Sequence, residues 1–87
     1  MDNTTRDKAV NLIASYFANW KACDAAQNYK EGREYYAKYS GALQLALLLG
    51  VDNDAGENAL ETEIQSTAYK LYGDAISTAY NDTFPTW

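Results

Sequence analysis

The apolar side chains of this chain of 87 residues recur at intervals of three and four positions, which is the period of an amphipathic helix. A first helix is predicted over 4–26, because one stripe runs along this segment and contains Val10, Ile13, Phe17 and Trp20. Thr4 and Asp7 have the spacing of a capping box at its start. Between Asp24 and Asn28 no apolar side chain is larger than Ala, so we expect a turn there; one long bent helix is the alternative.

A second helix is predicted over 29–49 by a stripe that contains Tyr29, Gly32, Tyr36, Tyr39, Leu43 and Ala46. Its last turns, 43–49, are apolar on nearly every side, and a helix that is apolar all round must be buried all round. We therefore expect this helix to lie in the middle of the molecule, or a partner chain to cover part of it. Gly50 is suited to end the helix in the left-handed conformation.

A third helix is predicted over 55–81, started by Asp54 and Glu57 and carrying the stripe Leu60, Ile64, Ala68, Leu71, Ala75 and Ala79. Pro85 is expected to end it before a short aromatic tail, in which Trp87 is either disordered or an anchor. The sequence thus predicts one all-α domain over 1–87, an antiparallel three-helix bundle. We interpret Gly41 and Gly73 as sites of close helix contact, the alternative being a kink that shapes a pocket.

Composition excludes several kinds of catalytic and metal site. The chain has no His and one Cys, so it has neither a Ser–His nor a Cys–His pair, no Cys-cluster zinc site and no internal disulfide. We expect Cys23 to be a small buried apolar residue. A calcium loop over 52–63 fails, because Glu57 stands where the required Gly would be. We expect a protein that is not an enzyme and has no catalytic residues, no cofactor and no metal.

We also expect no targeting signal. No run approaches the 18 apolar residues of a transmembrane helix, and the polar N-terminus does not resemble a signal peptide. We expect no membrane partner and a location in the cytoplasm of the producing or host cell.

The net charge of −5 is unevenly distributed. Residues 1–51 carry six basic and five acidic side chains, whereas 52–87 carry one basic and seven acidic ones. This balance argues against direct binding of duplex nucleic acid. Acids at a helix start are often structural, because they complement the helix dipole. The functional interpretation is a patch for a basic partner, formed by Asp52, Asp54, Glu57, Glu61 and Glu63.

Two further groups of residues are candidates for binding. Aromatic rings and a guanidinium group could stack a nucleotide, and the candidates are Tyr29, Arg33 and Tyr35. The alternative is that the tyrosines of the second helix form the core and its amphipathic rim, with Tyr36 and Tyr39 buried. Self-association would use the leucine-rich helix end, and the candidates are Leu45, Leu48 and Leu49.

Part of the chain resembles the microtubule-interacting-and-trafficking domains. The residues that carry the resemblance are Lys8-Ala9-Val10, the segment 24–29 and Tyr36. The resemblance implies a three-helix bundle that binds partner helices. The first helix is about one turn too long for that family, and Gly32 stands where the family usually has Ala. A weaker similarity to a tetratricopeptide repeat covers 29–45. We interpret both similarities as convergence of helical hairpins and carry over no site residue.

The function that we expect is non-enzymatic binding: a small acidic inhibitor or adaptor that engages a basic surface of a protein partner. The acidic, Tyr-rich composition is typical of small phage or mobile-element products, and the partner would then be a host defence or nucleic-acid-binding protein. A nucleotide or small-ligand binder and a structural homo-oligomer are the alternatives.

Overall fold

The computed structural model describes the backbone of residues 2–83 and the side chains of 2–81. Three helices follow one another along the chain: α1 (Asn3–Ala25), α2 (Tyr29–Leu48) and α3 (Glu57–Thr83). The prediction of an all-α three-helix bundle is confirmed. The expected roles of Pro85 and Trp87 fall outside the described residues.

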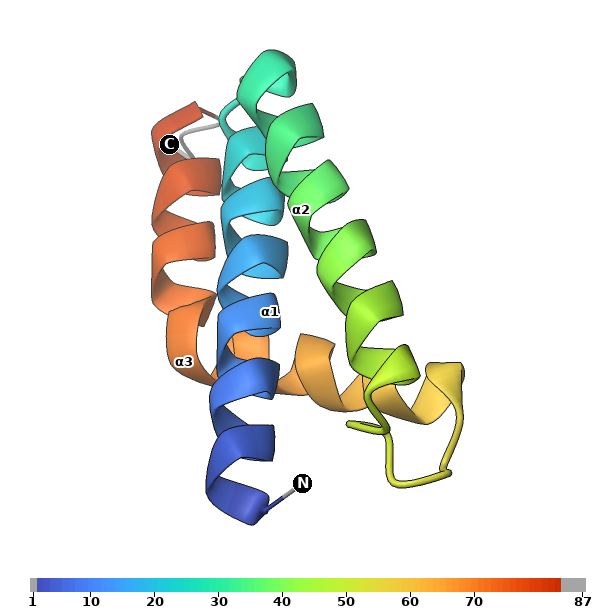
Figure 1. Ribbon diagram of the computed structural model, residues 1–87. Coiled ribbons are helices and arrows are strands. Elements are labelled where there is room, and N and C mark those ends of the chain that lie inside the picture. The colour runs from blue at the N-terminus through green and yellow to red at the C-terminus, as the bar shows by residue number, and fades with distance from the viewer. Residues whose placement is uncertain (1, 84–87) are drawn as a thin grey trace.

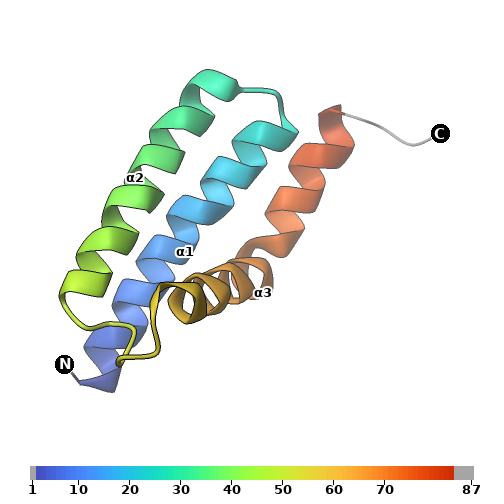
Figure 2. The same ribbon diagram turned by 90° about the vertical axis from the view of Figure 1, so that its right-hand side faces the viewer.

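The first helix, α1, lies in the middle of the molecule. It forms an antiparallel hairpin with α2 and packs on its other side against α3, whereas α2 and α3 touch only weakly (Figures 1 and 2). The expectation that the second helix is central is therefore wrong. The reason is the width of the apolar face of α1, whose buried positions serve two neighbours at once: Val10, Ile13, Ala14, Phe17 and Ala18.

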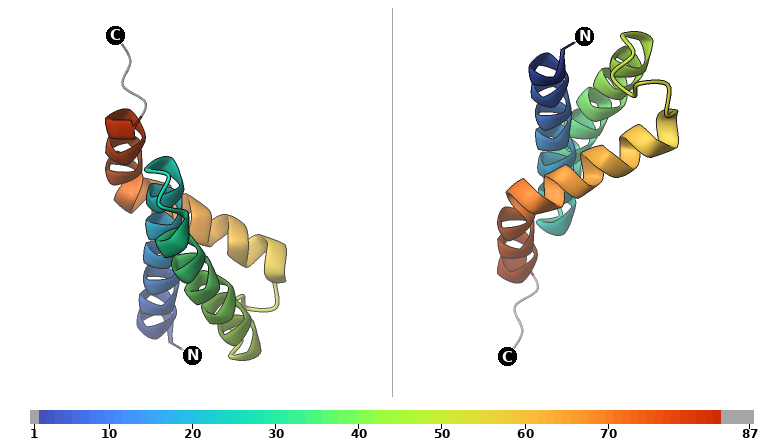
Figure 3. Two further views of the ribbon diagram at one scale, coloured as in Figure 1. Left: turned by 90° about the horizontal axis from the view of Figure 1, so that it is seen from above. Right: turned by 90° about the horizontal axis from the view of Figure 1, so that it is seen from below.

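The third helix, α3, is bent. Its first half crosses the lower part of the hairpin, and its second half turns to run beside α1 (Figures 1 and 3). The packed positions advance by four, in the order Leu60, Ile64, Ala68, Tyr72 and Ile76. Each step of four residues turns about 40° further around a straight helix, so only a bent helix keeps both ends of this stripe on α1. Leu71, which we expected in the stripe, is half exposed because the stripe passes through Tyr72 instead.

The start of α1 is capped by Asp2. Its Oδ1 accepts a hydrogen bond from the amide of Thr5 at 2.8 Å, and its Oδ2 accepts one from the Thr5 hydroxyl at 3.2 Å. These bonds lower the pKa of Asp2. The predicted capping box is wrong in its residues, because Thr4 already lies inside the helix.

Both helices of the hairpin end with a residue in the left-handed conformation. Gln27 has φ +60°, and the next amide, that of Asn28, donates to the carbonyl of Cys23 at 2.8 Å. Gly50 has φ +77°, and the amide of Val51 donates to Ala46 at 2.9 Å. The predicted turn and the predicted glycine cap are confirmed, and the single long helix is excluded.

The loop before α3 is organised by Asp52. Its Oδ2 accepts from the amide of Gly56, directly before the helix, at 3.0 Å. Asp54 lies within the loop at φ +65°. The prediction that Asp54 starts the third helix is therefore wrong.

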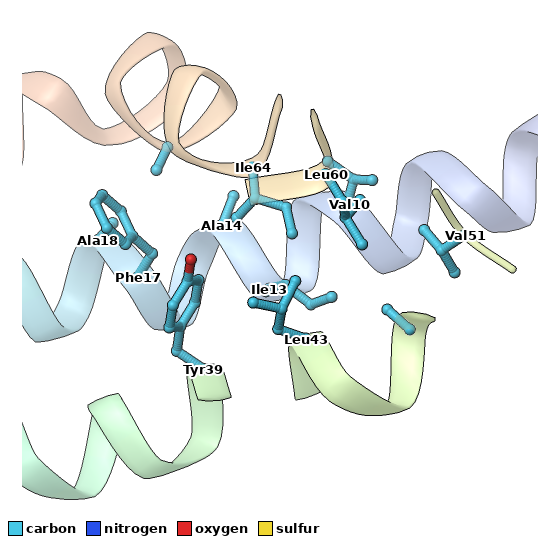
Figure 4. Close-up of a cluster of buried hydrophobic side chains, with 12 residues drawn as sticks. Val10, Ile13, Ala14, Phe17, Ala18, Tyr39, Leu43, Val51, Leu60 and Ile64 are labelled. Carbon is cyan, nitrogen blue, oxygen red and sulfur yellow. The ribbon is translucent and has the colours of Figure 1, made fainter. Parts of the chain in front are cut away.

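The core is one cluster to which all three helices contribute. Ile13 of α1 and Leu43 of α2 lie beside each other in it (Figure 4). On the α3 side the most deeply buried large side chains are Leu60 and Ile64. Towards the upper end of the hairpin the cluster becomes aromatic, through the rings of Phe17, Trp20, Tyr36, Tyr39 and Tyr69.

The close helix contact is at Gly32. A Cβ atom there would lie 3.0 Å from Oδ1 of Asp24 and 3.4 Å from Cβ of Cys23. At Gly41 and Gly73 a Cβ would meet nothing within 4 Å, so the interpretation of these two as contact residues is wrong.

Candidate binding surfaces

Arg6 of α1 joins three parts of the chain. Its Nε donates to the carbonyl of Val51 at 2.7 Å, and its two terminal nitrogens donate to Glu63 of α3 at 2.8 and 2.5 Å. The Arg6 side chain is 15% exposed and that of Glu63 42%. Hydrogen bonding to Arg6 holds the pKa of Glu63 below its ordinary value. The signal in the sequence is that Arg6 precedes Val10 by four residues and so shares its buried face.

The pairing changes the predicted acidic patch. Glu63 is engaged with Arg6, and Asp52 with the loop backbone, so two of the five acids already have partners inside the molecule. Asp54 and Glu57 are exposed, and Glu61 is partly buried. Arg6 and Glu63 form the one ion pair among the described side chains, so these three carboxylates make no ion pair within that part of the chain.

A shallow hollow of about 420 Å³ lies where the end of α2 meets the start of α3. It is lined by Gln44, Leu47 and Leu48 from α2 and by Glu57 from α3. The Leu48 side chain is 85% exposed, the most of any large apolar side chain that the structure describes.

An apolar groove of about 220 Å³ runs between α1 and α2. Leu45 of α2 and Leu49, directly after α2, line it, and they are 57% and 58% exposed. From α1 it is lined by Ala9 and by Leu12, which is 53% exposed and which the sequence analysis did not single out. The three leucines predicted for self-association therefore do not share one surface. Leu45 and Leu49 line the groove, whereas Leu48 lines the hollow between α2 and α3.

The residues predicted to stack a ligand lie in the first turns of α2, where Arg33 follows Tyr29 by one helical turn. Tyr29 and Arg33 are exposed, and neither lines the hollow or the groove. The ring of Tyr35 instead lies under the Lys38 ammonium, 5.1 Å from it.

The other tyrosines of α2 pack against Trp20. The ring centroids of Tyr36 and Trp20 are 4.9 Å apart, and those of Tyr39 and Trp20 are 6.0 Å apart and stacked. Tyr39 is buried as expected, but Tyr36 is half exposed. The Lys21 ammonium lies 4.1 Å from the Trp20 ring, and this contact covers part of the aromatic cluster.

Cys23 is partly buried, and burial raises the pKa of its thiol. A raised pKa lowers the fraction of thiolate, which is the nucleophilic form. Its contact with Gly32 agrees with a packing role.

Within residues 2–81 no group of three or more Cys, Asp or Glu side chains is placed to hold a metal ion. No described helix is both long and apolar enough to cross a membrane.

In comparisons with known proteins, no family model, no curated protein and no solved structure matches this chain.

Proposed function

We propose that the chain is a non-enzymatic protein-binding module, an inhibitor or adaptor that engages a basic surface of its partner. The contact would be made by the acidic leucine surface, which we define as Leu48, Asp54, Glu57 and Glu61. The observation that carries the proposal is the 85% exposure of Leu48 beside Glu57, at the hollow between α2 and α3.

An exposed leucine surrounded by carboxylates suits a partner with an apolar contact inside a basic rim. Burying one leucine side chain contributes about 1.5–3 kcal/mol, while the charges guide encounter and select the partner. Glu57 and Glu61 lie four residues apart on one helix and repel each other. A cationic partner would relieve that repulsion.

The partner class that fits is a protein with clustered Lys and Arg side chains. Nucleic-acid-binding proteins have such surfaces, and carboxylates can stand there in place of phosphates. If the chain is a phage or mobile-element product, a host defence protein with such a surface is the expected target.

The test is capture of partners from a host lysate with two variants of matched charge change. Asp54→Lys/Glu57→Lys/Glu61→Lys reverses the acidic leucine surface. Its control, Glu31→Lys/Glu34→Lys/Asp74→Lys, reverses three exposed acids elsewhere.

We expect the wild-type chain and the control to recover the same basic protein, and the surface variant to lose it. Recovery by the wild type should also fall as salt is raised. Equal recovery by both variants, with native circular dichroism for each, would contradict the proposal.

A further inference from the structure

The groove between α1 and α2 is an uncharged surface on a chain of net charge −5. None of the side chains that line it is charged, and its rims are the half-exposed leucines Leu12, Leu45 and Leu49. Contiguous exposed apolar surface on a small protein marks an interaction site. We propose that a second copy of this chain packs on this groove, forming a two-fold symmetric dimer.

No other part of the chain that the structure describes covers the groove. Leu12 lies about 160° around α1 from Val10, which is in the core, so the groove opens on the side of the hairpin away from α3.

The distribution of charge favours a second copy over a charged partner. A chain of net charge −5 repels its own copies wherever its acidic segment faces them. Residues 1–51, which form the hairpin, carry six basic and five acidic side chains, so two hairpins meet nearly without net repulsion. Because α3 lies across α1 from the groove, its carboxylates stay apart in such a pair. A basic partner, by contrast, finds no carboxylate in the groove lining.

The groove is small, so the dimer contact would extend over the hairpin face around it. Two helices side by side, each about 30 Å long and 10 Å wide, present about 600 Å². This area matches the lower end of specific interfaces, about 1,200 Å² in total. In a two-fold pair the same patch serves both copies, so the leucines of one copy lie against the groove of the other.

The test measures molar mass by light scattering and sedimentation over a range of concentrations up to about 1 mM. We expect wild type to approach twice the monomer mass of 9.7 kDa. Leu45→Glu should raise the dimer dissociation constant at least tenfold. Leu48→Glu is the matched control, because it makes the same change on the same helix at a more exposed site outside the groove, and it should leave the dimer intact. Leu12→Glu tests the groove from α1 should Leu45→Glu fail to fold.

The outcomes separate this proposal from the proposed function. Leu48→Glu should weaken capture of the basic partner and preserve the dimer, whereas Leu45→Glu should do the reverse. Contacts between differently labelled copies in a filtered NOE experiment should join Leu12 or Leu45 to Ala9 or Ala42 of a second copy. A wild-type monomer at every concentration overturns the dimer, and so does equal dissociation by Leu45→Glu and Leu48→Glu.

Discussion

At the scale of single residues, Gly41 lies inside α2 although no neighbouring group occupies the space left by its missing side chain. Nothing lies within 4 Å of the place where its Cβ would be. Glycine inside a helix costs about 1 kcal/mol relative to alanine. We therefore expect Gly41→Ala to increase the free energy of unfolding by about 1 kcal/mol and to raise Tm by about 4–8 °C.

Gly32→Ala is the matched control for that substitution. It makes the same change in the same helix, but its Cβ would meet Asp24 Oδ1 at 3.0 Å, so its gain should be smaller or negative. Thermal unfolding followed by circular dichroism measures both. A loss of stability in Gly41→Ala would mean that α2 needs a glycine there for a reason other than packing.

Tyr39 has a hydroxyl group that is buried without a hydrogen bond of ordinary geometry. Burial raises the pKa of this phenol, and the Gln65 side chain lowers it only in part. A buried polar group without a partner destabilises the fold. Tyr39→Phe should therefore increase the free energy of unfolding, by about 1 kcal/mol in urea denaturation.

The control for Tyr39→Phe is Tyr36→Phe, which removes a hydroxyl from a half-exposed ring on the same helix. This variant should change stability by less than about 0.5 kcal/mol. If Tyr39→Phe instead destabilises the protein, Gln65 or a bound water must satisfy the hydroxyl.

At the scale of elements, the sequence predicts the three helices well because each carries an apolar stripe of helical period. The second helix was expected over 29–49 and is found over Tyr29–Leu48. The caps were harder, since several polar residues compete at each end: Asp2 caps α1 in place of Thr4, and Asp52 organises the start of α3 in place of Asp54. Local spacing cannot decide between such neighbours.

The arrangement of the helices was less predictable than their positions. Apolar side chains around 43–49 suggested a central second helix, but Leu45 and Leu48 face solvent in the single chain. The bend of α3 follows from an apolar stripe that advances by four residues. This stripe can be recognised in the sequence only once α1 is known to be the helix on which α3 packs. Likewise, the sequence alone groups Glu63 with the surface acids, because its partner Arg6 is 57 positions away and only the fold brings the two together.

At the scale of the whole molecule, Arg6 links α1, the loop after α2 and α3, and this link depends on pH. The folded pKa of Glu63 lies below its ordinary value of 4.5. The ion pair therefore stabilises the fold fully above pH 4.5, and this contribution is lost as the pH falls through the lower folded pKa.

We expect Glu63→Gln to reduce the free energy of unfolding at pH 7 by about 1 kcal/mol, a modest value because Glu63 is 42% exposed. Its difference from wild type should shrink as the pH falls below 4.5, since the wild-type carboxyl then becomes neutral as well. Urea denaturation at several pH values measures the difference, and Glu34→Gln, at an exposed site, provides the control. A difference that stays constant with pH would show that the charge of Glu63 is not what stabilises the link.

The central place of α1 also sets the order in which the molecule can be completed during synthesis. The helix on which both others pack leaves the ribosome first, and α2 can close on it as soon as the hairpin turn has emerged. The side of α1 that meets α3 must wait until Leu60 and Ile64 have been made. In that interval the nascent hairpin exposes apolar surface on both of its faces, and it is then that the growing chain most needs protection from premature association.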